Sequence, residues 1–445
     1  MTTGYYLEKF KYKKLKIHGI WFLCGTVFLL TFPRFLPYWT LALFMLAGLM
    51  EWIKRREELL PAFKKDIIYI SGPFLFFLIS FIWVVIQKPP LKLYSDSFLY
   101  LLVPVLGYPF FSSPGLSQRF LVIIKWFIAG ILVICLFEFL RAVVSSIYFD
   151  EGSMVLNPDV DHDTAASSID YFSAKSRFRS FGLVAFSHPY YLAFEVVFAL
   201  FLLWRFRKWH GVNLSCLMII FILLSVYLFQ ISSRSSFISA ALILIYYISR
   251  YLYMKKKSWI LPVAGPLIIF LFFSFSMLNQ RIREKTEYFI EQVKNKPGDI
   301  SDTDPRLLAW ITSAELIREN PLTGLGFRAR DSLYARYEKN GYAYGARLKI
   351  NPHSQFLESQ LTFGIPGTLV LLWLLIAPLI RKPRSMEMDL YLTFLIIVFT
   401  GSLFASFLFN NWGTLFFVLF YCLIVFKRDT EENMSADMAD NKDII

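Results

Sequence analysis

Three residues in this 445-residue chain have the types and positions that phosphate chemistry needs. Arg234 lies among four serines, and Arg306 and His353 each directly follow a proline. We expect each of the three at a helix N-terminus, where unpaired N–H groups and the helix dipole favour anions. An arginine added there makes a site suited to phosphate. The same field disfavours an imidazolium, so we expect His353 to stay neutral and able to accept a proton.

The residues that follow His353 have a second regularity. Gln360, Gly364 and Gly367 lie seven, eleven and fourteen positions after it. At about 100° per residue, these offsets return to nearly the same face of a helix. We therefore expect a face with the histidine at its mouth and two glycines deeper down, where another helix or a lipid chain could approach the backbone.

Each candidate also has a plainer interpretation. Arg306 could be a solvated charge or a helix-cap partner, and Arg234 could pair with a lipid phosphate. A histidine at a helix start is often structural, and glycines in membrane helices often serve packing. Arg177 and Arg179, shortly before the expected sixth helix, could support an anion site or meet headgroups. No residue pattern indicates a metal site.

The composition indicates the surroundings of these residues. Hydrophobic residues make up 56% of the chain and charged residues only 18%, a balance that a soluble domain of this length would not tolerate. The formal net charge of +13 might indicate a nucleic-acid partner, but Lys and Arg cluster in short runs between apolar stretches. We therefore predict an integral membrane protein whose partners include membrane lipids and no nucleic acid.

Apolar stretches of roughly 17 to 25 residues mark the membrane helices. The pattern predicts an all-α polytopic protein with about twelve of them, forming one transmembrane domain over residues 1–445. The expected helices span 17–33, 36–53, 67–87, 98–114, 120–143, 183–204, 214–231, 236–254, 259–277, 354–380, 389–409 and 412–426.

Short basic loops set the orientation, because Lys and Arg are retained on the cytoplasmic side. Runs near residues 54–65, 205–208, 255–257 and 381–384 all fall on one side. Both termini, with the tail 427–445, are then cytoplasmic. Two long connections, 144–182 and 278–353, fall on the opposite side.

The connection 278–353, between expected helices nine and ten, should be partly helical. Residues 304–320 form an amphipathic helix pattern with Asp304 as N-cap, and Asn320-Pro321 ends it. Asn351-Pro352 supplies a second cap just before the tenth membrane helix. We therefore expect this large loop to be folded and to carry Arg306.

These motifs resemble those of a known family. His353-Ser354, nine residues, and then Gly364-Ile365-Pro366-Gly367 fit the pattern His-[Asn/Ser/Gln]-x9-Gly-x-x-[Gly/Thr/Tyr] of the O-antigen ligase and polymerase superfamily. The second motif of that family, Arg-x3-Leu, is similar to Arg234–Ile238, where isoleucine replaces leucine. The topology of about twelve helices with a large loop between helices nine and ten is similar too.

The resemblance implies a function. Members of this family have a GT-C-like membrane fold and transfer glycan from an undecaprenyl diphosphate carrier without a metal, a nucleotide sugar or any other cofactor. For this chain it implies a multi-pass enzyme of the bacterial inner membrane, with its active site facing the periplasm. Arg234 and Arg306 would hold the diphosphate, and His353 would take the proton of the acceptor hydroxyl, with inversion at the sugar carbon.

Three functions stay open at this point. A ligase would use the lipid A-core as acceptor, and the complete histidine motif favours this interpretation. A polymerase would use another carrier-linked repeat unit and shares the motifs. A transporter or lipid flippase is the alternative from another class, although we find no repeated half and no paired broken helices in the sequence.

Overall fold

A computed structural model describes most of the membrane-spanning region and part of the large loop. The described residues are 19–33, 35–91, 94–150, 153–156, 176–177, 180–181, 188–207, 213–231, 233–256, 305–380 and 388–427, with a few isolated positions between 260 and 290. Most of the expected helix 259–277, nearly all of the tail 427–445 and Arg179 therefore lie outside the described residues.

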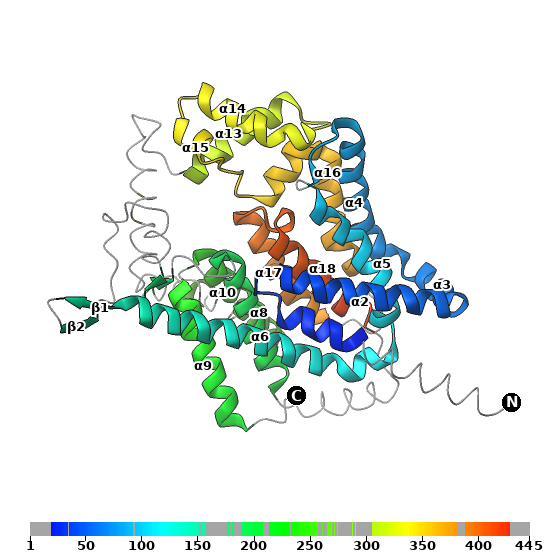
Figure 1. Ribbon diagram of the computed structural model, residues 1–445, viewed down its shortest axis with the longest axis vertical. Helices are drawn as coiled ribbons and strands as arrows, with labels where there is room; N and C mark the ends of the chain where they lie inside the picture. The colour runs from blue at the N-terminus through cyan, green and yellow to red at the C-terminus, as the bar shows by residue number, and fades with distance from the viewer. Residues whose placement is uncertain are drawn as a thin grey trace.

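Helices make up nearly all of the described chain (Figure 1). The first half contains a helix at Gly19–Phe28, then α2 (Phe35–Lys54), α3 (Arg56–Lys65), α4 (Ile67–Gln87), η2 (Ser95–Phe98), α5 (Leu99–Phe111) and α6 (Pro114–Ser146). The second half contains α8 (Pro189–Arg205), α9 (Leu214–Ile231), α10 (Arg234–Met254), α13 (Pro305–Glu319), η6 (Gly326–Arg328), α14 (Ala329–Lys339), α15 (Ala343–Arg347), α16 (Gln355–Ile380), α17 (Met388–Phe404), η7 (Phe407–Phe409) and α18 (Asn411–Val425).

Six of these helices are long and apolar enough to cross a membrane, namely α2, α4, the greater part of α6, α9, α10 and α16. Shorter apolar helices lie at Gly19–Phe28, Ser95–Phe111, Met388–Phe404 and Asn411–Val425, and α8 overlaps the predicted span 183–204. These findings agree with a helical membrane protein, whereas the count of twelve spans stays a prediction.

Two of the expected loops contain secondary structure that was not predicted from the sequence. The basic loop after α2 contains α3, whose charged ends are the acids Glu57 and Glu58 and the bases Lys64 and Lys65, as the helix dipole favours. The first long connection contains two short antiparallel hairpins, β1 (Ile147–Asp150) with β2 (Ser153–Leu156) and β3 (Ser176–Arg177) with β4 (Ser180–Phe181). Branched and aromatic residues in 147–149 and 154–156 favour strands, which explains the first hairpin.

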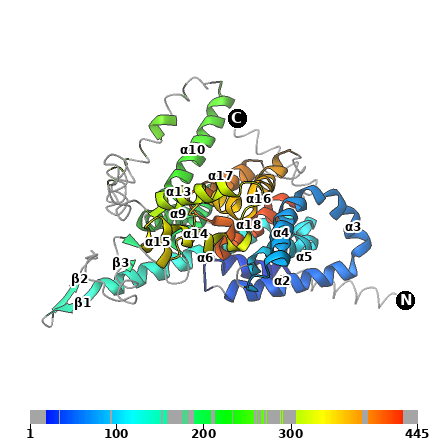
Figure 2. The same ribbon diagram turned by 90° about the horizontal axis from the view of Figure 1, so that it is seen from above.

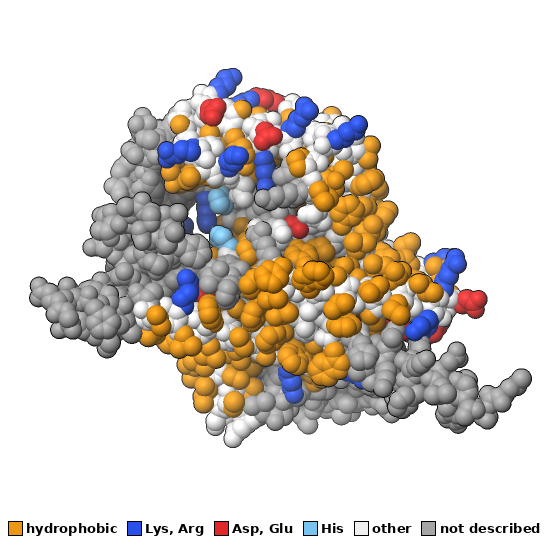
Figure 3. Space-filling view, in the orientation of Figure 1, with side chains coloured by type: hydrophobic (Ala, Val, Ile, Leu, Met, Phe, Trp, Pro, Cys, Tyr) orange, Lys and Arg blue, Asp and Glu red, His pale blue; other side chains and the backbone are white. Residues whose placement is uncertain are grey.

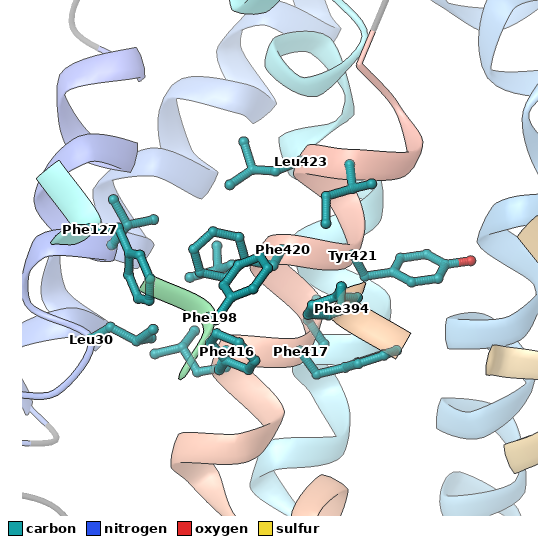
Figure 4. Close-up of a cluster of buried hydrophobic side chains, with 14 of the residues drawn as sticks. Leu30, Phe127, Phe198, Phe394, Phe416, Phe417, Phe420, Tyr421 and Leu423 are labelled. Carbon is teal, nitrogen blue, oxygen red and sulfur yellow. The ribbon is translucent and has the colours of Figure 1, made fainter. Parts of the chain in front are cut away.

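Aromatic rings fill the centre of the helix bundle. Phe127 of α6, Phe198 of α8 and Phe420 of α18 meet there, with ring centroids 4.8 Å apart for Phe127 and Phe420 and 4.9 Å apart for Phe198 and Phe420 (Figure 4). Nearly every side chain of α18 is buried. This helix is therefore the axis around which the others pack, and its ends fix the positions of η7 and the first turn of α8.

Residues 305–347, which we call the cap, form a separate layer above one end of the bundle (Figures 1 and 2). Leu316, Leu333, Tyr337 and Tyr342 of the cap share a small hydrophobic core with Leu361 of α16. In this described part of the expected loop, α13 lies where the sequence predicts a helix over 304–320, while the large loop 278–353 as a whole stays a prediction. The cap rests on α16 through its own apolar core.

A close backbone crossing joins the cap to α16. Gly364 has a φ of +66°, and a Cβ at this position would lie 2.3 Å from the carbonyl oxygen of Leu322. Gly324 faces it, with a φ of +68° and no room for a Cβ. Backbone hydrogen bonds from Leu325 N to Leu361 O (2.9 Å) and from Ile365 N to Pro321 O (3.0 Å) close the contact.

The prediction that Gln360, Gly364 and Gly367 share one continuous helix face is wrong. The helix is broken at Gly364, and the chain that approaches it is the turn 321–324, not another helix or a lipid. The side chain of Gln360 donates to Pro321 O at 2.8 Å and therefore binds the same turn. A Cβ on Gly367 would lie 2.4 Å from Phe363 Cβ, so this glycine allows the kinked helix to close on itself.

We expect Gly364→Ala to destabilise the protein by more than the roughly 1–3 kcal/mol of backbone strain alone, because the new Cβ also collides with Leu322. Gly341→Ala is the matched control, since Gly341 has a φ of +78° and open space around it. Thermal unfolding of the purified variants in detergent measures both effects. Equal losses for the two variants would show that the crossing contributes nothing beyond the strain.

Candidate functional site

Both predicted arginines lie at helix N-termini. Arg234 is the first residue of α10, after Ser233 as N-cap, and Arg306 is the second residue of α13. Both side chains are half-buried. Each of these helices therefore carries an arginine at its positive end. This is the combination predicted from the sequence to favour phosphate.

The first turn of α8 brings the two arginine-bearing helices to one place. The hydroxyl of Tyr190 donates to Gly401 O of α17 at 2.8 Å and lies near Ser235, the neighbour of Arg234. Arg306 lies close enough to Tyr190 to exert an electrostatic effect on it. The N-terminal turns of α8 and α10 thus lie side by side, with Arg306 of α13 near enough to act on Tyr190 electrostatically.

His188 explains why α8 begins beside this convergence. It is the N-cap of α8, and its Nδ1 accepts a hydrogen bond from Tyr190 N at 3.2 Å. Pro189 occupies the first helical position, where its missing N–H costs nothing. The N-cap residue His188 and Pro189 together fix the start of α8, and therefore the position of the Tyr190 ring.

His353 lies just before α16, not at its second position as predicted. The side chain of Asn351 accepts from His353 N at 3.0 Å, and α16 begins at Gln355. This asparagine forms a turn of its own instead of capping the helix directly, and His353 takes a φ of +48°. A non-glycine residue in this region costs about 1–3 kcal/mol, and such residues cluster at functional sites.

An ion pair that the sequence did not indicate joins the cap to α16 a short distance from His353. Arg330 of α14 donates to Glu358 Oε1 from Nη2 at 2.6 Å and from Nε at 2.8 Å. The side chain of Glu358 is only 4% exposed. Its charge raises the pKa of Arg330, so the guanidinium stays charged. A carboxylate in a span as apolar as 355–380 was the signal for this pair, since acids within membrane helices are usually functional.

A cavity of about 320 Å³ lies against this ion pair, between the cap and the bundle. It reaches the first turn of α8 at Tyr191 and the turn before α16 at Asn351. The surface is hollowed between the cap and the bundle, and histidine and basic side chains are visible in the hollow (Figure 3). The remaining walls come from η2, α5, η6 and the segment around η7.

The two supporting arginines are not placed by this geometry. Arg177 lies in strand β3, and its side chain is outside the described residues, as is all of Arg179. Their predicted support for an anion site stays a prediction.

Comparison with known proteins agrees with the motif analysis. Residues 219–372 match the family model described as O-antigen ligase. The matched segment includes α10, the described cap, His353 and the Gly364 crossing. No curated protein matches the chain. The match to the family model supports the resemblance to the O-antigen ligase and polymerase superfamily over residues 219–372.

Proposed function

We propose that this protein is a metal-independent glycosyltransferase of the O-antigen ligase type, which moves a glycan from undecaprenyl diphosphate to a sugar hydroxyl of the lipid A-core. The observation that supports it best is that the N-termini of α10 and α13, each with an arginine, converge near the first turn of α8. The enzyme would be located in the bacterial inner membrane, with both termini cytoplasmic and this convergence on the periplasmic side.

Each side chain has a separate part in the proposed reaction. His353 takes the proton from the acceptor hydroxyl, whose oxygen forms a bond to the anomeric carbon of the donor glycan. The bond from that carbon to the diphosphate oxygen breaks, and its electron pair leaves with the diphosphate. Attack opposite to the leaving group inverts the anomeric carbon. Arg234 and Arg306 stabilise the negative charge that grows on the leaving group.

The structure of the His353 turn supports its part as base. The residue is held by the hydrogen bond of its own N–H to Asn351, in a strained backbone conformation within the turn that borders the cavity at Asn351. A strained and fixed backbone reduces the number of positions that the imidazole can take, which favours catalysis by positioning.

We expect His353→Ala to lower the transfer rate by about a hundredfold or more, the usual contribution of a positioned general base. The measurement is glycan transfer by purified protein from an undecaprenyl diphosphate-linked donor, with thermal unfolding as the test of folding. A folded variant that retains full transfer would remove the central claim. Purified wild-type protein that moves substrate across liposomes without any transfer would favour a transporter instead.

Arg306→Gln should lower transfer by about a hundredfold, the scale of losing one preorganised donor to a developing charge. Arg318→Gln is the matched control, because Arg318 is an exposed arginine near the other end of the same helix. Binding of undecaprenyl diphosphate to the detergent-solubilised variants should weaken for Arg306→Gln and stay unchanged for Arg318→Gln. Equal behaviour of the two variants would contradict the assigned role.

The choice between ligase and polymerase can be tested in a gene-deletion strain. We expect loss of all surface polymer and accumulation of carrier-linked chains, because a ligase attaches finished chains to the lipid A-core. A core capped by a single repeat unit would show instead that the protein is a polymerase that joins carrier-linked repeats. Electrophoresis of the extracted lipopolysaccharide distinguishes the two patterns.

A further inference from the structure

The cavity between the cap and the bundle is bordered by Tyr191, the residue after Tyr190 in the first turn of α8. Arg330 and Glu358 line this cavity, whereas Arg234 and Arg306 are not among its lining residues. The cavity volume of about 320 Å³ is at the lower end of the roughly 300–1,000 Å³ typical of small-molecule sites. It is therefore a second space beside the proposed diphosphate site.

Two buried polar atoms at this cavity have no hydrogen-bond partner among the described residues. Glu358 accepts both bonds of Arg330 through Oε1, which leaves Oε2 without one. Ser406 Oγ is the other, and both residues are 3% exposed. Leaving such groups unpaired is costly, so their presence points to a ligand with hydrogen-bonding groups of its own. A carboxylate oxygen accepts, and therefore calls for a ligand that donates.

The charge of the lining indicates the class of that ligand. Arg330 contributes one positive charge, and Glu358 and Asp96 contribute two negative charges, so the ionised side chains sum to −1. This balance disfavours phosphate, in contrast to the positive charges of Arg234 and Arg306. The other polar side chains of the lining are neutral hydroxyls and amides, Ser95, Ser97, Thr362, Ser406, Asn351, Asn410 and Asn411.

Aromatic rings complete the lining. Tyr100, Tyr191, Phe327, Phe363 and Phe409 all border the cavity. The hydroxyl of Tyr100 is already used, since it donates to Leu408 O at 2.9 Å, so its ring is what remains for a ligand. The negative faces of aromatic rings attract the polarised C–H groups of a sugar ring. Ring faces together with hydroxyls, amides and one accepting carboxylate oxygen fit a neutral saccharide.

The cavity wall is continuous with the turn that holds His353. Asn351 lines the cavity, and its side chain accepts from His353 N. Glu358 is linked to the same turn, since its N–H donates to Ser354 O at 2.9 Å. A saccharide bound here would therefore lie next to the residue assigned as base. We propose that this cavity is the binding site of the acceptor saccharide, recognised as a neutral sugar through Glu358 Oε2 and Ser406 Oγ, an inference that rests on the proposed function.

The test is a direct measurement of saccharide binding that needs no turnover. The full-length protein in lipid nanodiscs would be titrated with methyl glucoside, methyl N-acetylglucosaminide and glucose 1-phosphate, and saturation-transfer NMR would give the dissociation constants. Glu358→Gln and Ser406→Val are the cavity variants. Glu315→Gln is the matched control, because Glu315 also pairs with an arginine of the cap, Arg336, away from the cavity.

We expect at least one neutral glycoside to bind the wild type more tightly than the sugar phosphate does. Either cavity variant should weaken this binding by about tenfold, the scale of a hydrogen bond to a charged or buried group. Glu315→Gln and Arg234→Gln should leave it unchanged. In transfer assays, the cavity variants should raise the KM for the acceptor and not that for the lipid-linked donor.

Failure of this inference is distinct from failure of the proposed function. Equal binding to the wild type and to both cavity variants, or no binding of any neutral glycoside, would overturn the acceptor site even if glycan transfer is found. A rise in the donor KM alone would assign the cavity to the donor sugar, and would overturn it too. Saccharide binding that depends on Glu358 and Ser406, in a protein that transfers no glycan, would instead overturn the proposed function.

Discussion

The backbone of α16 and the turn after α13 pass so close to each other at Gly364 and Gly324 that neither position has room for a Cβ. This crossing fixes the height of the cap above the bundle and breaks α16 at the same time. Because α13 begins with Pro305 and Arg306, the place of one proposed diphosphate ligand depends on it. The position of Arg330 over Glu358 depends on it too, since α14 follows the same turn.

Other contacts hold the cap where the crossing leaves it free to rotate. Gln87 at the end of α4 donates to Leu325 O at 3.0 Å and accepts from Arg328 N at 3.3 Å. The Arg330–Glu358 pair is on the other side of this segment. A buried ion pair adds little net stability, because the cost of removing two charges from water offsets their attraction. The hydrophobic core that the cap shares with Leu361 is therefore the better source of its stability, and the ion pair sets its orientation.

Much of this arrangement could be predicted from the sequence, because the signals were local. Pro305 and the pair Asn320-Pro321 mark the two ends of α13. The serines around Arg234 mark the start of α10. The turn of Asn351 also has a local cause, yet the sequence does not say whether an asparagine caps a helix directly or forms a turn two residues earlier. His353 would belong to the helix if Asn351 capped it directly. Because Asn351 forms a turn instead, His353 lies before the helix. The prediction for the glycines after His353 is wrong for a related reason. Residue spacing predicts a shared face only in a continuous helix, and Gly364 interrupts this one.

Apart from the short hairpins and the turn of Asn351, the contacts that sequence reasoning missed join distant parts of the chain. Tyr190 meets Gly401 and Ser235, and Arg330 meets Glu358, across separations that no periodicity records. Arg234 and Arg306 place positive charge at the N-termini of α10 and α13, whereas the ionised side chains that line the cavity sum to −1. In the proposed reaction, this difference would favour the diphosphate beside the two arginines and disfavour it in the cavity, while a neutral acceptor would not be repelled from the cavity. The unlike charges would thus direct the two substrates to different places without a moving part.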